Sequence, residues 1–307
     1  MRQLVYLLGH HIAHSKSPVM HNALYKQMGL KWDYLSEDKA TDEAAAAFIE
    51  KRDFLGLNIT TPHKPIAYEK ADIRAASAKL ACGANVLAHK NGKLIAYNMD
   101  GEGCISYLEQ RNVVFHGKTV VICGSGPTAL AILHSSALAG AQKVVLIGRN
   151  KERTKRVLNR YLKEYGKLAY ATIELPPLHD GHRGFRQAYN ETQFSYGSYR
   201  SSKQVFGGAD IIINATPVGM KPGQRLPLDF DRLHEGQDVF DVVYGHGESH
   251  FLYEANMRGC QTFDGAGMLV AQAVATDKVF FEIAEIDYRL SDSEMFSIMA
   301  AAAGFEC

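Results

Sequence analysis

The sequence predicts an α/β protein of two domains, each built on a mostly parallel sheet. Three observations support this. The 307 residues are about enough for two domains. Short β-branched runs alternate with helical stretches twice, once before and once after residue 118. At "KTVVICGSGPTALA" an apolar run passes through a glycine turn into a helix, as in doubly wound nucleotide-binding domains.

The first hundred residues give the first alternation. "LVYLL", "WDYL" and "LGLNITT" read as strands, and "TDEAAAAFIEKR" reads as a helix. Another helix is expected to open at Ser17-Pro18, with Ser17 as N-cap and Pro18 at the first helical position. Asn91-Gly92 lies between "NVLAHK" and "KLIAY" and predicts a hairpin with a type I′ turn.

The second alternation begins at Lys118. Its expected strands are "KTVVIC", "KVVLIG", "ATIEL", "ADIIINAT" and "DVFDVVY", and the basic segment "KERTKRVLNRYLKEYG" is expected to form a long helix. Two final helices, "GMLVAQAVATDKVFFEIAE" and "SDSEMFSIMAAAAG", are expected to return to the first domain. The predicted domains are residues 1–101 with 266–307, for substrate binding and catalysis, and residues 102–265, for dinucleotide binding of the Rossmann type.

One stretch departs from this rhythm. Residues 177–204 are rich in Gly, Ser, Tyr and Arg and are long for a connection inside a compact domain. We interpret them as an exposed insertion with a short helix. The alternative is a flap over a bound adenosine.

Composition excludes several classes of protein. With 34 basic and 33 acidic side chains, the chain has no general electrostatic attraction for nucleic acid or an anionic membrane. No apolar run reaches the length of a membrane span, and the amino terminus lacks the pattern of a signal peptide. The five cysteines show no C-x-x-C spacing, which favours reduced thiols in the cytoplasm. His10, His11 and His14 have no partner at ligand spacing, so no metal is expected.

The glycine turn fits G-x-G-x-x-A, with Gly124, Gly126 and Ala129 at the three marked positions. Gly124 is expected to make the tight turn. Gly126 is expected to let a pyrophosphate approach backbone N–H groups at the helix start, where the helix dipole favours anions. Alone the motif is weak, because a glycine turn also occurs where no nucleotide binds.

Polar clusters in the first domain are candidates for a substrate site. "AHSKSP" offers the hydroxyls of Ser15 and Ser17. "NITTPHKP" places Asn58, Thr60 and Lys64 at the carboxyl end of a strand, where open α/β sheets carry ligands. "AYNMDGEG" places Asn98 and Asp100 where the hairpin enters a helix. Each has a structural alternative, with Ser17 or Asp100 as a helix cap and Lys64 as a solvated charge.

Together these clusters resemble the shikimate/quinate dehydrogenase family. "IAHSKSP" is similar to its S-x-S-P loop, "NITTPHK" to its N-[VI]-T-x-P-x-K segment, and "YNMDG" to its N-T-D-G. "GSGPTA", "INATPVGM", "DVVY" and "DGAGMLVAQA" follow in the family's order, so the resemblance covers nearly the whole chain. It favours reading the glycine turn as a dinucleotide cradle.

The resemblance implies roles for particular residues. Lys64 and Asp100 are expected to be the catalytic pair, in which the ammonium stabilises charge on the carbonyl oxygen and donates a proton. The residues expected to bind the substrate carboxylate and hydroxyls are Ser15, Ser17, Thr60, Asn85, Tyr244 and Gln272. Those expected to bind the cofactor are Gly124, Ser125, Gly126, Pro127, Thr128, Ala129, Arg149, Asn150, Arg153, Thr216, Pro217, Val218 and Gly265.

The preferred cofactor follows from the strand "KVVLI". NAD-binding domains usually end this strand with Asp or Glu, whereas here "GRNKER" follows and offers Arg149 and Arg153 to a 2′-phosphate. NADP is expected, with NAD as the alternative, and Glu152 lies close by. The structural alternative is that both arginines are solvated side chains at the start of a helix.

The implied function is reversible, NADP-linked interconversion of 3-dehydroshikimate and shikimate in the chorismate pathway, by a monomer or homodimer. Quinate or another shikimate-like compound is the alternative substrate, and Met99, where the family usually has Thr, bears on that choice. Asn85 aligns only if one residue is deleted before it. Val242, where some members have Met, is read as a packing change. His63 is interpreted as a surface residue beside a proline, with an electrostatic influence on Lys64 as the alternative.

Two other functions fit the sequence less well. A methylene-tetrahydrofolate dehydrogenase has a related scaffold but no reason for the S-x-S-P loop. A dinucleotide sensor without turnover has no need for Lys64 and Asp100, since fold alone does not fix function.

Overall fold

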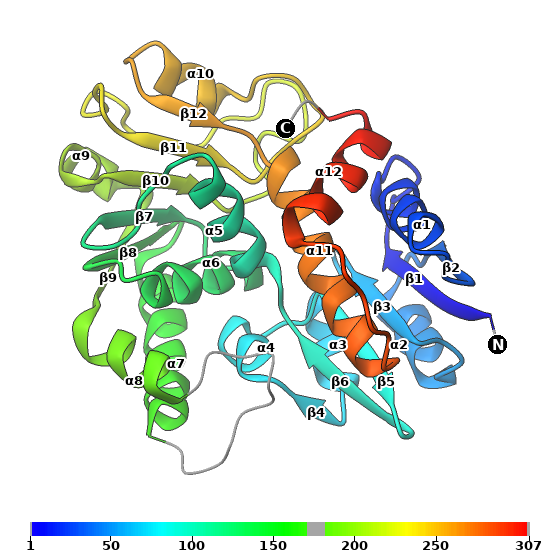
Figure 1. Ribbon diagram of the computed structural model, residues 1–307. Coiled ribbons are helices and arrows are strands. Elements are labelled where there is room, and N and C mark those ends of the chain that lie inside the picture. The colour runs from blue at the N-terminus through cyan, green and yellow to red at the C-terminus, as the bar shows by residue number, and fades with distance from the viewer. Residues whose placement is uncertain (1, 171–181, 306–307) are drawn as a thin grey trace. The chain divides into compact units, whose positions relative to one another are not determined.

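The computed structural model describes residues 2–170 and 182–305 (Figure 1). The chain forms two compact units, one of Met1–Gly103 with Leu269–Cys307 and the other of Cys104–Met268. It passes from one unit to the other inside α5 (Asp100–Gln110) and again inside α11 (Ala266–Ile283). Each unit contains one six-stranded sheet, so the predicted α/β class with two sheets is confirmed.

The sheet of the first unit has the strand order β2-β1-β3-β5-β6-β4. Strand β1 pairs in parallel with β2 and β3, whereas β5 runs antiparallel to β3 and β6. The strands are β1 (Gln3–Gly9), β2 (Trp32–Asp38), β3 (Gly56–Ile59), β4 (Ile73–Arg74), β5 (Val86–Lys90) and β6 (Lys93–Tyr97). The remaining helices are α1 (Ser17–Gln27), α2 (Asp42–Lys51), α3 (Lys64–Lys70), α4 (Ala76–Ala81) and α12 (Asp292–Ala303).

The predicted hairpin is confirmed. Asn91 and Gly92 have φ values of 52° and 74°, and Lys90 pairs with Lys93 across the turn. Both central residues have the positive φ that a type I′ turn requires. The hairpin leads the chain from β6 directly to Asp100.

The parallel strands β1, β2 and β3 end at one edge of this sheet, because parallel strands share their direction. The connection after β1 carries Ser15, and the connection after β3 carries Thr60 and leads to Lys64. Beneath them, Leu8, Leu57 and Ile59 are buried in a core with Phe48 and Ile49 of α2. The hydrophobic sheet therefore supports the loops that carry the candidate substrate residues.

The second unit has a parallel sheet with the order β12-β11-β10-β7-β8-β9. This is the doubly wound order. From β7 the sheet is extended on one side by β8 and β9 and on the other side by β10, β11 and β12. Nucleotides bind in such sheets at the point between β7 and β10 where the strand order reverses. The strands are β7 (Thr119–Cys123), β8 (Lys143–Gly148), β9 (Gln193–Ser198), β10 (Ile211–Asn214), β11 (Asp238–Asp241) and β12 (Gln261–Phe263). The α-helices are α6 (Pro127–Leu138), α7 (Lys151–Ala169), α8 (His182–Glu191), α9 (Ser202–Val205) and α10 (His250–Asn256), and the 3₁₀ helices are η1 (Tyr199–Ser201) and η2 (Phe206–Gly208).

In the described part of residues 177–204 the expected short helix is present as α8, but the interpretation as an exposed insertion is wrong. Strand β9 extends the sheet by pairing in parallel with β8, and α8 precedes it in the position of a crossover helix. Thr192 and Tyr199 at the two ends of β9 are buried. Residues 177–181 and the expected strand "ATIEL" lie outside the described residues.

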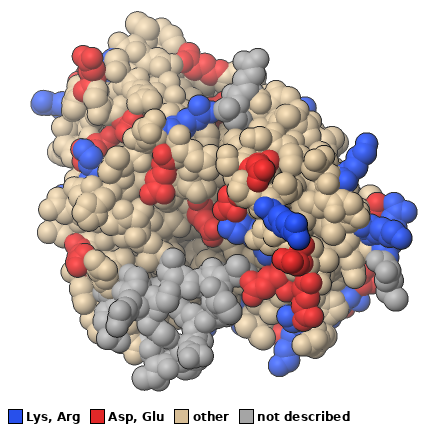
Figure 2. Space-filling model, in the orientation of Figure 1, with Lys and Arg blue, Asp and Glu red and all other residues tan. Residues whose placement is uncertain are grey.

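Charged side chains of both signs are interspersed with uncharged ones on the face shown in Figure 2, in keeping with the balanced composition. Among the helices that the structure describes, none has the length and apolar character needed to cross a membrane.

Candidate active site

A lysine–aspartate ion pair lies in the first unit. Lys64 is the first residue of α3, which follows β3, and Asp100 is the first residue of α5, which follows β6. The Lys64 Nζ donates to Asp100 Oδ2 at 2.5 Å, and the two side chains are 16% and 7% exposed. The structure therefore brings together the two residues expected to be catalytic, in a largely desolvated setting where their charges interact strongly.

Asn85 holds the other side of this carboxylate. Its Nδ2 donates to Asp100 Oδ1 at 2.8 Å, and its Oδ1 accepts from the Met99 N–H, also at 2.8 Å. Asn98 Oδ1 accepts from the Asp100 N–H. Asp100 is thus fixed at both carboxylate oxygens and at its backbone, and Asn85, whose alignment needed a deletion, lies beside it.

The hydroxyl donors expected at the substrate are presented by the loops after β1 and β3. Ser15 Oγ donates to Ser17 Oγ at 3.3 Å and accepts from the Ser17 N–H at the same distance. Ser17 was expected to cap α1, but the N-cap is Lys16, and no side chain caps this helix. The reason is that Ser17 lies within the first helical turn, where Ser15 accepts from its N–H. Thr60 is half-buried at the end of β3.

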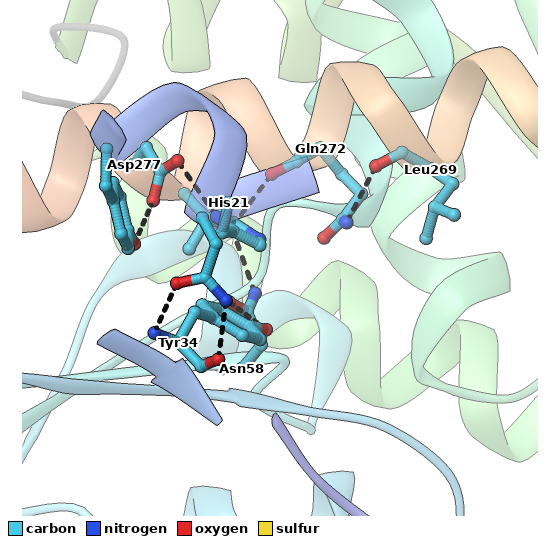
Figure 3. A network of polar contacts seen from close by, with 9 residues as sticks. His21, Tyr34, Asn58, Leu269, Gln272 and Asp277 are labelled. Carbon is cyan, nitrogen blue, oxygen red and sulfur yellow. Dashed lines mark hydrogen bonds and ion pairs between the residues drawn. The ribbon is translucent and has the colours of Figure 1, made fainter. Parts of the chain in front are cut away.

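Behind these loops lies a buried polar network that sequence reasoning missed (Figure 3). Asp277 of α11 accepts from Tyr25 Oη at 2.8 Å and contacts His21 Nδ1 at 2.9 Å, and both Asp277 and His21 are fully buried. The His21 ring stacks on Tyr34, with 4.1 Å between centroids, and Tyr34 Oη donates to Asn58 Oδ1 at 3.0 Å.

This network joins α1 to α11 through side chains that a single sequence gives no reason to pair, because residues 21 and 277 are far apart along the chain. Asn58 Nδ2 donates to Thr276 Oγ1 at 3.3 Å, so Asn58 binds protein groups at both ends of its amide. Gln272 lies on the same helix, one turn before Thr276, and its Nε2 donates to the Leu269 carbonyl (Figure 3). The network therefore supports the helix that carries Gln272.

In the second unit the glycine loop joins β7 to α6. Gly124 has φ +132°, and an added Cβ would lie 3.0 Å from the Ala215 carbonyl oxygen, so a side chain here would be strained by the backbone conformation and crowded by its neighbour. Gly126 is the N-cap of α6, and no atom lies within 4 Å of the position its Cβ would take. This open space above a helix N-terminus fits the pyrophosphate of a dinucleotide, which such termini bind through N–H groups and the helix dipole.

Arg149 and Arg153 are exposed at the start of α7. Neither makes an ion pair with any carboxylate of residues 2–170 or 182–305. Asn150, which is expected at the cofactor, caps the helix, because its side chain accepts from the Arg153 N–H at 2.9 Å. The two guanidinium groups remain available for a 2′-phosphate.

Two buried polar residues, Asn214 and Asp241, hold the segment Thr216–Val218 in place by hydrogen bonds, and neither was predicted from the sequence. Asn214 Nδ2 donates to the Val218 carbonyl and to Asp241 Oδ1, and Asn214 Oδ1 accepts from Thr216 Oγ1 at 2.7 Å. Burial raises the pKa of Asp241 to about 6, although hydrogen bonds from Ser249, Val243 and Asn214 favour the charged carboxylate and lower this pKa in part. The sequence feature that could have identified Asn214 and Asp241 is the polar residue that ends each apolar run, in "IIIN" and "DVFD".

Tyr244 and Gly265 follow in the same unit. Tyr244 is half-buried after β11, and burial raises its pKa above the ordinary value, so its hydroxyl stays a hydrogen-bond donor at neutral pH. The Gly265 N–H donates to the Val243 carbonyl. Among the described residues no group of three His, Cys, Asp or Glu side chains is arranged to hold a metal ion.

One unit is doubly wound and has an open glycine loop, and the other has a lysine–aspartate pair held by an asparagine amide. These are the features of a dinucleotide-dependent oxidoreductase. Residues 7–87 match the family model of the shikimate dehydrogenase substrate binding domain. The shikimate dehydrogenase (NADP(+)) of Methanopyrus kandleri is 32% identical over 88% of this chain and 87% of its own length.

Two solved structures are similar over nearly the whole chain. A shikimate dehydrogenase in complex with NADP⁺ is 26% identical, with a TM-score of 0.76 over 97% of this chain and 95% of its own. Shikimate 5-dehydrogenase from Listeria monocytogenes, in complex with shikimate and NAD, is 25% identical, with a TM-score of 0.75 over 97% and 96%. The chain belongs to the shikimate dehydrogenase family.

Proposed function

We propose that the chain is an NADP-dependent oxidoreductase that interconverts 3-dehydroshikimate and shikimate, a step of the chorismate pathway. The observation that carries the proposal is the largely buried Lys64–Asp100 pair, in which Lys64 holds one carboxylate oxygen and the Asn85 amide holds the other. Membership in a family whose similar relatives are NADP-dependent shikimate dehydrogenases supports the substrate and the cofactor.

The chemistry of the pair follows from its charges. The nicotinamide, when bound, supplies or accepts a hydride at the substrate carbon. During reduction of the ketone, negative charge grows on the carbonyl oxygen, and the Lys64 ammonium stabilises this charge and donates the proton that completes the hydroxyl. In the reverse direction the same nitrogen accepts that proton. Asp100 orients the ammonium and accepts a hydrogen bond from the reacting hydroxyl.

The remaining substrate contacts are proposed on the same basis. Ser15, Ser17 and Thr60 donate to the carboxylate and ring hydroxyls, with Asn85, Gln272 and Tyr244 completing the set. A site that hydrogen-bonds several hydroxyls rejects analogues that leave its donors unpaired. This favours a small polyhydroxylated ring carboxylate.

For the cofactor, we propose that residues 124–129 bind the pyrophosphate, together with Thr216, Pro217, Val218 and Gly265. Arg149 and Arg153 contact the 2′-phosphate, since Arg forks match phosphate oxygens. Asn150 contributes by capping the helix that presents them.

Quinate is the second candidate substrate, and Met99 is the observation that favours it. Its side chain is buried, at 2% exposure, and its N–H is bonded to Asn85 beside Asp100. A thioether there replaces a hydroxyl near the reacting centre, which weakens the discrimination for shikimate. We further propose that the protein works in the cytoplasm as a monomer or homodimer.

Reduction of NADP⁺ or NAD⁺ by shikimate or quinate with the purified protein, followed by the absorbance of the reduced cofactor, tests these assignments. Shikimate with NADP⁺ is expected to give the largest kcat/KM. Quinate turned over about tenfold better, roughly 1.4 kcal/mol of transition-state preference, would establish the second candidate. Failure with both compounds would contradict the substrate assignment, and equal kcat/KM values for the two cofactors would contradict the NADP preference.

A further inference from the structure

Three loops of the first unit are joined to one another beside the catalytic lysine. They follow β1, β2 and β3, and the second is defined by residues 38–42, which run from the last residue of β2 to the first residue of α2. The Lys39 N–H donates to the Gly9 carbonyl at 2.8 Å, and the His10 N–H donates to the Thr61 carbonyl at 3.2 Å. The loops approach so closely that a Cβ on Gly9 would lie 2.4 Å from the Thr60 methyl group.

His63 closes this arrangement with its side chain. It was expected at the surface, but its side chain is fully buried. Its Nε2 lies 2.8 Å from the Lys39 carbonyl oxygen and its Nδ1 lies 2.7 Å from Asp42 Oδ1. The residue directly before Lys64 therefore links the loop after β3 to residues 38–42.

Both partners of the ring are hydrogen-bond acceptors. A backbone carbonyl carries no proton, and an ionised carboxylate only accepts. An imidazole can donate to two acceptors only when both of its nitrogens are protonated, which makes it a cation. Asp42 is the carboxylate that balances this charge. Among the other charged groups of these helices, Lys64 pairs with Asp100 and Lys70 with Glu50, while the Lys39 ammonium pairs with Glu37.

We infer that His63, held as an imidazolium between Asp42 and the Lys39 carbonyl, is a positioning residue for Lys64. The inference rests on the proposed catalytic role of Lys64. His63 is the N-cap residue of the short helix that Lys64 begins, so a fixed ring at position 63 sets where the lysine chain starts. Charge-assisted hydrogen bonds on both sides make this a firm attachment.

Loss of the hydrogen bonds of the His63 ring is expected to lower turnover. A displacement of about 1 Å at a reacting group can cost up to about 10²-fold in rate. Ser15 lies in the loop after β1, and Ser17 begins α1 at the end of that loop. Residues 38–42 hold this loop separately, because Asp38 accepts from His10 Nδ1 and from the Ile12 N–H. Loss of the His63 attachment is therefore expected to lower kcat while KM for shikimate changes little.

Asp42 is the position to vary, because its side chain is 59% exposed and Thr41, the N-cap, supports the helix start without it. Asp42→Ala is expected to lower kcat by about tenfold, with KM for shikimate within about threefold of wild type. Asp42→Asn is expected to keep kcat within about threefold, because its amide can donate to a neutral ring and preserve the attachment. The matched control is Glu43→Ala, which removes the neighbouring exposed carboxylate and is expected to act as wild type.

The protonation of His63 is read directly from the ¹⁵N chemical shifts of its ring at pH 7. Two protonated nitrogens are expected in the wild type. A neutral ring, or a wild-type kcat for Asp42→Ala, would overturn the inference. A wild type that does not oxidise shikimate contradicts the proposed function instead, and the His63 signals then decide the state of the ring without any substrate.

Discussion

Asp100 shows how much of the site is visible at the scale of single residues. Its carboxylate binds Lys64 on one oxygen and Asn85 on the other. Lys64 and Asp100 could be selected from short motifs that follow strands, at the edge where ligands bind, whereas Asn85 precedes β5 and was selected only through the family resemblance. His63 could not be placed in this way. Its burial depends on Asp42 and Lys39, which approach it only after the three strands pair.

Met99 is the residue at which we expect substrate preference to change. Its side chain is buried, and its backbone N–H donates to Asn85, which also donates to Asp100. We expect Met99→Thr to raise the ratio of kcat/KM for shikimate to that for quinate by about fivefold, within the roughly 1–3 kcal/mol that one side-chain contact can contribute to discrimination. Steady-state kinetics with both substrates measure this ratio. A ratio unchanged from wild type would show that Met99 does not influence specificity.

At the scale of elements, the N-terminus of α7 is the predicted determinant of the cofactor. We expect Arg149→Ala and Arg153→Ala each to lower kcat/KM for NADP⁺ by about tenfold, since a charge-assisted bond contributes roughly 1.5–3 kcal/mol, and to leave NAD⁺ kinetics unchanged. Lys163→Ala serves as the control, because Lys163 is exposed on the same helix further from its start. Equal losses with both cofactors would contradict a contact with the 2′-phosphate.

Elements with strong local signals could be predicted from the sequence, and those that depend on pairing could not. The hairpin at Asn91-Gly92 was predictable because its turn requires two positive φ values. Strand β9 was missed because "QFSYGS" lacks a β-branched run and becomes a strand only by pairing with β8. The start of α1 was predicted at Ser17-Pro18, but Lys16 holds the N-cap position.

At the scale of the whole molecule, two sheets divide the candidate functions between two units. The first unit carries the lysine–aspartate pair, and the second carries the glycine loop and the exposed arginines. The sequence indicated this division by two rounds of alternating strands and helices. It could not indicate the contact between His21 and Asp277, since periodicity reports which residues are buried and not which of them meet.

Asp241 makes the stability of the protein depend on pH. Its folded pKa of about 6 lies above the ordinary value of 3.8 because burial disfavours the charged form. Its favourable contribution is therefore complete below pH 3.8 and is lost as pH rises through about 6. We expect the free energy of unfolding to fall between pH 4.5 and 7.5 by about 2 kcal/mol more in wild type than in Asp241→Asn, which cannot titrate. Urea unfolding at both pH values measures this difference, and identical pH slopes would contradict it.

The central claim is that Lys64, held by Asp100, transfers the proton that accompanies hydride transfer. The most direct test is kcat for shikimate oxidation with NADP⁺ in Lys64→Ala, beside Lys70→Ala, which removes a lysine from the other end of the same helix. Lys64→Ala is expected to lower kcat by at least about 10²-fold, the usual cost of losing a general acid or base, with KM changed only modestly. Lys70→Ala is expected to match wild type. Near-normal turnover in Lys64→Ala would contradict the claim.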